Sequence, residues 1–381
     1  MFEMQGAYGT AKVFATETDE TTYAQILSML NNPAFEDMDI AIQADCHAGA
    51  GSVIGFTGKL QCKVVPNLVG VDIGCGVLAC RIPWNSIPKN CNLQGLDEHI
   101  HANIPSGFRG HSDENNLEFI KVAETEMLTE AKANLIARIP TDSYWAKVGT
   151  LGGGNHFIEL SKNSDTDLWL IIHSGSRNFG LQVAKWHQDR AREKNPGFKD
   201  QEFMYMDDGG VDYLADMFRA QNYARINRIV MARIILRYFG VSIESCEVIE
   251  SVHNYIDQND QIVRKGAISA YEGQKVVIPM NMAFGTVIGV GKGSSVHNWS
   301  APHGAGRVMG RNVAKRTLKM DDFKVAMKDV FSTTVSEATL DEAPMAYKDP
   351  EKILSVLGET VQVESILKPI YNFKDATKEK T

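Results

Sequence analysis

The chain has 381 residues, 44% of them hydrophobic, and its 39 basic and 47 acidic side chains give a formal net charge of −8. This size allows a large buried core and roughly two domains, while the acidic charge argues against a protein that coats nucleic acid non-specifically. No apolar run approaches the ~18 residues that span a bilayer, and the N-terminus lacks the features of a signal peptide. The six cysteines form no CxxC pair, so we expect a cytoplasmic protein with reduced thiols.

Hydrophobic periodicity predicts the secondary structure along the chain. Apolar positions at helical spacing predict helices over residues 22–30, 117–137 and 212–239. Short apolar runs predict buried strands over residues 40–42, 168–172, 246–249, 276–279 and 286–290. No repeat, low-complexity segment or Pro/Ser-rich linker divides the chain. The sequence therefore predicts a single α+β domain, with chemistry-bearing residues in loops at strand ends.

Glycine-rich turns near these strands carry side chains that could hold a metal ion. Asp72 and Cys75 lie three residues apart in a tight glycine turn, so a carboxylate and a thiolate can converge on one ion. Three histidines beside glycine or small polar residues could join them, namely His156, His173 and His253. Five ligands are too few for two closed four-coordinate sites unless Cys75 bridges or substrate completes the shells. Each residue taken alone favours a turn, core or hydrogen-bonding role, whereas the five together favour a metal centre.

The segment from Ser300 to Arg307, with the sequence SAPHGAGR, places a histidine in a glycine-rich loop closed by an arginine. Small residues around His303 allow a phosphate to approach closely, and Arg307 offers a planar fork of donors that suits phosphate oxygens. His303 is therefore a candidate nucleophile for phosphorus, although a glycine-flanked histidine alone is more often structural. The K-x-D-G signature of lysine-nucleophile ligases and the Walker P-loop are both absent, which favours histidine for a covalent step.

Four basic residues lie in or beside these motifs and could form a local basic groove. For Arg177 and Arg307, held in glycine and serine turns, phosphate or RNA binding is the better interpretation. For Lys147 and Arg311, a scattered surface charge is equally consistent. His47, in another small-residue turn, is a further candidate for the site, but a structural role is slightly favoured for it.

The five motifs DIGCG, GGGNHFIE, HSGSR, SVHN and SAPHGAGR, in this order, resemble those of the RtcB-type RNA ligases, which join RNA ends through a GMP-linked histidine. The resemblance runs from about Asp45 to Lys374 and is closest to a compact bacterial branch of that family. It implies one catalytic domain over residues 1–381, with mixed β-sheets around a central metal and nucleotide cleft and with peripheral helices. Residues 375–381, where many relatives have already ended, are expected to form a flexible tail.

The resemblance also implies roles for individual residues. One manganese ion would be held by Asp72, Cys75 and His156, and a second by Cys75, His173 and His253, while His303 would accept GMP. The residues expected to contact the guanine nucleotide are Asn155, His156, Phe157, Ile158, Glu159, His253, Asn254, Pro279, Met280, Asn281, Met282, His303, Gly304, Ala305, Gly306 and Lys374. Lys374 aligns with a C-terminal lysine that meets the guanine base.

The implied reaction joins an RNA 3′-phosphate or 2′,3′-cyclic phosphate end to a 5′-hydroxyl end, with GTP and two Mn²⁺ ions as cofactors. GMP passes from His303 to the RNA 3′-phosphate, and the 5′-hydroxyl then attacks this 3′-pp-5′-G end. The expected setting is RNA repair or tRNA processing by a monomer. Manganese is chosen on family grounds, because thiolate and imidazole ligands also suit zinc, cobalt and iron.

One departure from the family pattern keeps alternatives open. Relatives commonly carry Pro-Gly-Ser-Met where this chain has Pro279-Met-Asn-Met282, so guanine selectivity and the joining step are in question. One alternative is a guanylyltransferase that caps RNA 3′-phosphates without efficient joining. Another is a catalytically inactive, metal-dependent binding protein, against which the complete set of candidate ligands argues.

Overall fold

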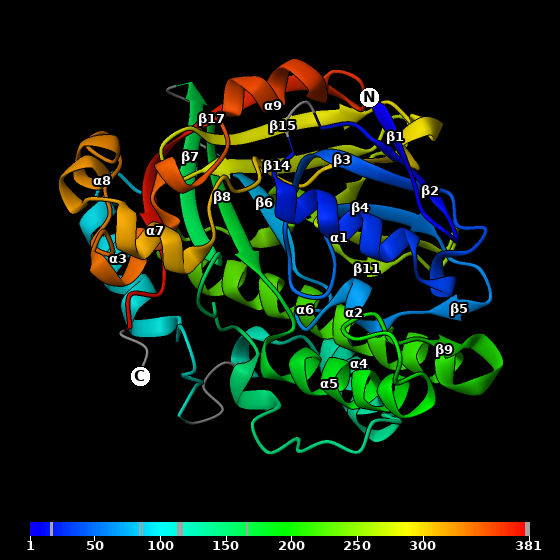
Figure 1. Ribbon diagram of the computed structural model, residues 1–381. Coiled ribbons are helices and arrows are strands. Elements are labelled where there is room, and N and C mark those ends of the chain that lie inside the picture. The colour runs from blue at the N-terminus through cyan, green and yellow to red at the C-terminus, as the bar shows by residue number, and fades with distance from the viewer. Residues whose placement is uncertain (16–17, 84, 86, 113–116, 165–166, 378–381) are drawn as a thin grey trace.

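The computed structural model describes residues 1–15, 18–83, 85, 87–112, 117–164 and 167–377. Its two large sheets are flanked by helices, which confirms the expected α+β fold (Figure 1). Four of the five expected strands lie within longer strands of these sheets, and the one expected over residues 246–249 begins one residue later, at Glu247. The helices expected over residues 22–30 and 212–239 are present, the second ending at Tyr238. Within the described residues, no helix combines the length and apolar content needed to cross a bilayer.

The larger sheet has seven strands, and the candidate site lies at one end of it. Its spatial order is β10 (Glu247–Val252), β6 (Gly76–Ile82), β8 (Asp167–Ser174), β7 (Phe157–Ser164), β17 (Val361–Phe373), β15 (Gly285–Gly291) and β14 (Lys275–Asn281). Neighbouring strands are antiparallel throughout. Strands far apart in the sequence are therefore adjacent, so one end of the sheet gathers loops from many parts of the chain.

The second sheet has six strands, in the order β1 (Phe2–Gln5), β2 (Thr10–Val13), β3 (Ile40–His47), β4 (Ile54–Lys59), β12 (Ile262–Lys265) and β11 (Asn254–Ile256). Over the described residues, the remaining strands form two short antiparallel pairs, β13 (Ala267–Ser269) with β16 (Ser300–Pro302) and β5 (Lys63–Val64) with β9 (Met204–Tyr205). The β13–β16 pair lies beside β3 and β10, between the two large sheets.

The helices lie around these sheets. They are α1 (Glu20–Leu30), α2 (Pro66–Val69), α3 (Leu93–Asn103), α4 (Val122–Ala133), α5 (Arg177–Lys194), α6 (Val211–Tyr238), α7 (Arg311–Thr317), α8 (Met320–Ala326) and α9 (Pro350–Leu357). Figure 1 shows α5 and α6 together below the sheets and α9 above β15. The sequence pattern did not predict α5, whose exposed face is rich in charge.

The helix expected over residues 117–137 is wrong in its bounds, since α4 covers only its middle. The chain at Lys121 is extended, and the Glu124 carboxylate accepts a hydrogen bond from the Lys121 N–H, which fixes the start of the helix at the next residue. Beyond the helix, the N–H groups of Ile136 and Ala137 donate to the buried carboxylate of Asp216 instead of continuing the helix. A tertiary contact therefore ends the helical pattern early.

Two buried polar side chains of α6 fix the loops that surround the site. Asn227 accepts hydrogen bonds from the N–H groups of Gly149 and Thr150 and donates to the Gly175 carbonyl. Arg228 donates to the carbonyls of Gly74 and Ser174. Because buried polar groups need partners, this helix holds the loop ends in defined places.

Candidate metal and nucleotide site

Four adjacent strands of the seven-stranded sheet bring the candidate metal ligands to one end of that sheet. The register pairs Val252 with Gly76 and His173 with Val77, and it pairs Phe157 with His173. Residues that end β10 and β8 therefore lie beside residues that begin β6 and β7. The antiparallel register places His253, Cys75, His173 and His156 in one cluster.

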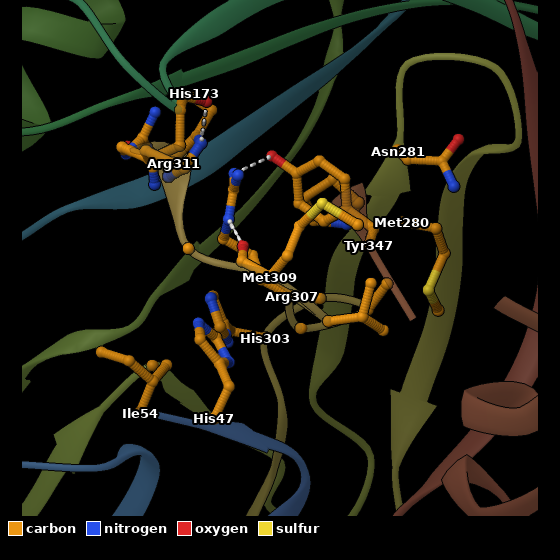
Figure 2. Close-up of a pocket in the computed structure, with 18 of the residues that line it drawn as sticks. His47, Ile54, His173, Met280, Asn281, His303, Arg307, Met309, Arg311 and Tyr347 are labelled. Carbon is orange, nitrogen blue, oxygen red and sulfur yellow. Dashed lines mark hydrogen bonds between the residues drawn. The ribbon is translucent and has the colours of Figure 1, made fainter. Parts of the chain in front are cut away.

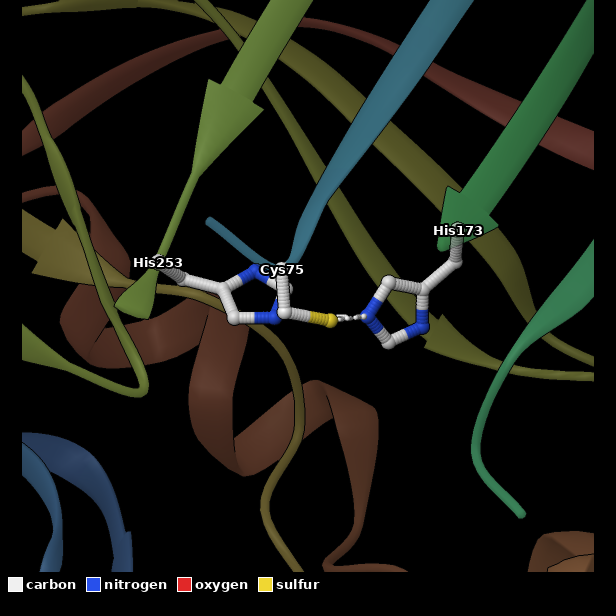
Figure 3. Close-up of side chains that lie close together, drawn as sticks. All are labelled: Cys75, His173 and His253. Atoms are coloured by element: carbon white, nitrogen blue, oxygen red, sulfur yellow. Dashed lines mark hydrogen bonds between the residues drawn. The ribbon is translucent and has the colours of Figure 1, made fainter. Parts of the chain in front are cut away.

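The cluster is tight enough for shared coordination. Cys75 Sγ lies 3.4 Å from His156 Nε2 and 3.2 Å from His173 Nε2. His156 Nε2 is 2.9 Å from Asp72 Oδ2, and His173 Nε2 is 3.3 Å from His253 Nε2. The ligand atoms form two groups that could each hold an ion, Asp72–Cys75–His156 and Cys75–His173–His253, with Cys75 common to both. Figure 3 shows the second group, with the sulfur pointing at the His173 ring.

The donor set fits a divalent metal ion better than it fits a set of internal hydrogen bonds. Burial lowers the pKa of His173 and of His253 well below the usual value, so both rings are neutral, as metal ligands must be. Burial also raises the pKa of the Cys75 thiol, which makes a thiolate there dependent on a nearby cation. His173 Nδ1 lies 3.1 Å from the Asn155 carbonyl oxygen, which assigns the proton to Nδ1 and leaves Nε2 free to bind.

His303 stands against this cluster and is oriented by a carboxylate. Its ring centroid is 4.8 Å from that of His253. Asp45, a fully buried residue near the end of β3, accepts hydrogen bonds from His303 through one oxygen, at 2.7 Å from Nδ1 and 3.2 Å from the backbone nitrogen. Nδ1 therefore carries a proton, and in the neutral ring the lone pair is on Nε2. Gly306 has φ 73°, and a Cβ there would collide with the Asp45 carbonyl, so the loop needs glycine at this position.

A cavity of about 860 Å³ opens beside His303, a size that suits a nucleotide. The expected nucleotide-contact residues that line it, apart from the two histidines, are Asn155, Phe157, Glu159, Asn254, Pro279, Met280, Asn281, Met282, Gly304, Ala305, Gly306 and Lys374. Figure 2 shows His303 and His47 side by side, with Arg307 and Tyr347 across from Met280 and Asn281. Two of the expected residues do not line the cavity. His156 lies in the candidate metal cluster, and alternation along β7 turns the Ile158 side chain into the hydrophobic core.

Two charged side chains of opposite sign meet the cavity from neighbouring strand ends. Glu159, on β7, is buried and accepts hydrogen bonds from Ser161, Thr286 and Asn372. Burial raises the pKa of its carboxyl to about 7. Lys374 directly follows β17, whose last residue, Phe373, pairs with Ile158. The cavity thus offers a carboxylate acceptor and an ammonium donor close together.

Glu342 is a site residue that sequence analysis missed. Its buried carboxylate lies 2.9 Å from Lys374 Nζ and 3.2 Å from Arg307 Nη1, and it also accepts hydrogen bonds from Arg311 and Tyr347. Burial opposes ionisation, but Lys374 and the two arginines hold the pKa of this carboxyl well below its usual range. Nothing in the local sequence signalled this role, since the three cationic partners Arg307, Arg311 and Lys374 lie 35, 31 and 32 residues away along the chain.

The four basic residues occupy two regions. Arg307 and Arg311 line the cavity and share Glu342, and Arg307 also donates to the Met309 and Asp341 carbonyls. Arg177 lies at the metal end, where a Cβ on Gly152 (φ 96°) would collide with its guanidinium and with the His156 ring. Lys147 is close to Arg177, which contributes to lowering its pKa after burial itself.

The segment Pro279–Met282 is accommodated without closing the cavity. Met280 and Met282 are 2% and 4% exposed and each packs into a separate hydrophobic cluster. Asn281 Oδ1 accepts the N–H groups of Ala283 and Phe284, which fixes the turn between β14 and β15. The larger side chains thus serve the packing of this hairpin.

His47 also lines the cavity, and its Nδ1 lies 3.0 Å from the Asp45 carbonyl oxygen. Burial lowers its pKa to about 4. Asp45, two residues earlier, was missed as the partner of His303, although its place in the same small-residue motif was an available signal.

Of the expected tail, residues 375–377 are described, and Asp375 accepts a hydrogen bond from Ser106 at 2.9 Å. Residues 378–381 lie outside the described residues.

Fold and site together define a mixed-sheet protein with a cysteine–histidine cluster beside a nucleotide-sized cavity. Comparison with known proteins gives the family. Residues 25–375 match the family model described as tRNA-splicing ligase RtcB. The chain is 30% identical to the RNA-splicing ligase RtcB of Escherichia coli K12, over 87% of this chain and 88% of that protein. It is 27% identical to the tRNA-splicing ligase RtcB of Aeropyrum pernix, over 83% of each chain. The chain therefore belongs to the RtcB family.

Proposed function

We propose that this protein is a GTP- and manganese-dependent RNA ligase that joins 3′-phosphate or 2′,3′-cyclic phosphate ends to 5′-hydroxyl ends. The observation that carries the proposal is the placement of His303, which has its Nδ1–H on Asp45 and its ring against His253, at the mouth of a nucleotide-sized cavity. A neutral imidazole so oriented is suited to attack phosphorus. The RNA-ligase names of the similar proteins support the same reaction class.

In the first step, His303 Nε2 attacks the α-phosphorus of GTP. An N–P bond forms, the bond to the bridging oxygen breaks, and pyrophosphate leaves. Asp45 accepts the hydrogen bond from Nδ1 throughout and stabilises the positive charge that develops on the ring. The product is a histidine–GMP phosphoramidate.

The next two steps transfer GMP and join the RNA. An oxygen of the RNA 3′-phosphate attacks the GMP phosphorus, the N–P bond breaks, and a 3′-pp-5′-G end forms. The 5′-hydroxyl of the second strand then attacks the RNA 3′-phosphorus, losing its proton, and GMP leaves. A 2′,3′-cyclic phosphate is first hydrolysed to a 3′-phosphate.

The metal proposal assigns one Mn²⁺ to Asp72, Cys75 and His156 and a second to Cys75, His173 and His253. Bound there, the ions would supply charge neutralisation on the phosphates and alignment of the attacking and leaving oxygens. Arg177, at the same end of the site, offers a guanidinium to a phosphate.

Guanine selectivity is proposed to rest on Glu159 and Lys374. The guanine edge carries two N–H donors beside the O6 acceptor, which complements a carboxylate acceptor next to an ammonium donor. Adenine presents the opposite arrangement at position 6. Competition between GTP and ATP for His303 labelling tests this assignment, and equal use of both nucleotides would contradict it.

Joining is favoured over capping alone because the side chains of Met280 and Met282 are packed into the hairpin clusters. The expected roles in RNA repair or tRNA processing, the cytoplasmic location and a single monomeric domain belong to the same proposal. Incubation with GTP, Mn²⁺ and broken tRNA or rRNA ends tests the reaction directly.

A further inference from the structure

Phe108 is the most exposed large apolar side chain in the described part of the chain, with 92% of its surface in solvent. It lies in the loop that follows α3, among Ser106, Gly107, Arg109 and Gly110. Its immediate neighbours in the sequence are glycine or polar, so the segment from Ser106 to Gly110 adds no second large apolar side chain beside it. An isolated aromatic ring in such a setting suits a flat partner better than a protein interface, which needs a packed apolar centre.

The loop that carries Phe108 is held firmly on both sides. Gly107 N–H donates to the Gly152 carbonyl at 2.9 Å, and His111 N–H donates to the Ala146 carbonyl at 2.8 Å. Arg177 Nη2 donates to the Gly107 carbonyl at 2.6 Å. The aromatic ring is therefore presented in solvent by a fixed backbone, which lowers the entropic cost of binding to it.

The loop forms the rim of the candidate metal cluster. Gly152, which accepts the hydrogen bond from Gly107, lies so close to the His156 ring that a Cβ there would collide with it. Arg177 connects the loop to the cluster, because it donates a hydrogen bond to the Gly107 carbonyl and interacts electrostatically with Asp72. One short chain of contacts therefore connects the Phe108 loop to the proposed metal ligands.

Two cations, Lys147 and Arg109, make hydrogen bonds within the Phe108 loop. Lys147 donates from Nζ to the Phe108 carbonyl, and its side chain passes over Gly110, where a Cβ would lie 3.4 Å from Lys147 Cδ. Arg109 donates to the Ser106 hydroxyl at 2.9 Å. Among the described residues, the Asp375 carboxylate also reaches this loop, where it accepts hydrogen bonds from the hydroxyls of Ser106 and Thr377.

We propose that Phe108 is a stacking platform for a base of the RNA strand that enters the site, with Lys147 and Arg109 meeting the phosphates next to that base. The inference rests on the proposed function and adds a binding subsite to it. Aromatic rings beside cations are the usual means by which proteins hold single-stranded nucleic acid, because every base has a face that can stack. The position next to the cluster places that base close to the broken end.

The test measures RNA binding by the full chain carrying Phe108→Ala, Phe108→Leu or Phe108→Tyr. The probes are short single-stranded RNAs with a 3′-phosphate or a 5′-hydroxyl, with 2-aminopurine at each of the last few nucleotides in turn. Phe108→Ala and Phe108→Leu should raise the Kd about 5- to 100-fold, the range for the loss of one base–aromatic stack. Phe108→Tyr should bind like the parent, and the 2-aminopurine signal should change at one position in the parent but not in Phe108→Ala.

Abasic RNA supplies the decisive control. Removing the base at the responding position should weaken binding to the parent and leave little further effect of Phe108→Ala, because both changes remove the same contact. Tyr8→Ala, which truncates an exposed aromatic side chain between β1 and β2, should bind RNA like the parent.

Three results would overturn the inference: equal RNA binding by Phe108→Ala and the parent, an equal loss with abasic and intact RNA, or loss of self-association in Phe108→Ala with RNA binding unchanged. The last result would assign Phe108 to a contact between copies of the chain. Labelling of the parent by GTP is measured in parallel. An unlabelled parent contradicts the proposed function, whereas a labelled parent with any of these three results contradicts only the stacking subsite.

Discussion

His303 Nδ1 lies 2.7 Å from Asp45 Oδ2, and this same carboxylate oxygen accepts the backbone N–H of His303 at 3.2 Å. Asp45 belongs to the six-stranded sheet, whereas His303 follows the short strand β16. One buried carboxylate therefore sets the backbone position, the ring orientation and the tautomer of the proposed nucleophile. The same contact joins the second sheet to the metal cluster, since the His303 ring packs on His253.

Asp45→Asn should slow the labelling of His303 by GTP about 100-fold or more. An asparagine amide can donate to Nδ1, which shifts the ring proton to Nε2 and removes the lone pair that attacks phosphorus. The measurement is the single-turnover rate of label transfer to protein. Asp39→Asn, which alters an exposed carboxylate paired with Lys12, is the matched control and should keep the parent rate. A parent-like rate in Asp45→Asn would show that the contact only supports the fold.

GTP affinity should rise with pH through about 7 if Glu159 accepts the guanine N–H groups. Burial raises the pKa of this carboxyl to about 7 in the folded protein, so the acceptor form accumulates as pH rises through that value. Below the pKa, binding should weaken up to about tenfold per pH unit. Isothermal titration calorimetry at pH values on both sides of 7 measures the affinity for GTP.

Glu159→Gln should bind GTP more weakly and lose most of this pH dependence, whereas Glu364→Gln, at an exposed position on β17, should behave as the parent does. A pH-independent GTP affinity in the parent would remove Glu159 from the base-binding proposal.

The raised pKa of Glu159 also affects stability. Between the ordinary pKa of about 4.5 and about 7, the folded state binds more protons at Glu159 than the unfolded state does. This residue therefore makes the free energy of unfolding fall as pH rises through that window.

Cys75→Ala should lose both bound ions, whereas His253→Ala should keep roughly one, because a shared ligand couples the two sites. Elemental analysis after loading with Mn²⁺ and desalting distinguishes these outcomes. Cys80→Ala, which truncates another buried cysteine near Cys75, is the control for packing and should keep the parent content. Unchanged manganese in Cys75→Ala would make the thiol a core cysteine.

A 3′-phosphate RNA, supplied with GTP, Mn²⁺ and excess 5′-hydroxyl RNA, should pass through the 3′-ppG form and accumulate as joined product. Asn281→Ser, which restores the smaller side chain of relatives, should change the joining rate less than threefold, since Asn281 serves the turn after β14. Gel analysis resolves the three RNA species. Persistent 3′-ppG without joined RNA in the parent, relieved by Asn281→Ser, would establish capping instead.

Local pattern was enough to predict the long helix α6, because its apolar positions keep helical spacing over many residues, and parts of five buried strands, each marked by a short apolar run. It failed at α4, where Asp216 takes the N–H groups that would have continued the helix. Asp216 lies 79 residues along the chain from Ala137. Contacts of this kind have no local signal.

In the site, too, residues with a local sequence signal were predicted, and residues positioned by tertiary contacts were not. Asp72, Cys75 and the histidines were recognisable because glycine and small residues mark their turns, and the family motifs ordered them. Glu342 contacts Lys374, which is 32 residues away, and Asp45 contacts His303, which is 258 residues away. The fold brings both pairs together, so the local sequence gives no sign of either contact. Ile158 was assigned from its position within a motif, but strand alternation turns it into the core.

We expect His303 to be the residue that carries GMP. Protein incubated with α-labelled GTP and Mn²⁺ should acquire acid-labile, base-stable label, because a phosphoramidate hydrolyses in acid, and peptide mapping should place the label on His303. His303→Ala should carry none, while His47→Ala, which removes another histidine that lines the cavity, should still be labelled on His303. Undiminished labelling of His303→Ala would contradict the account.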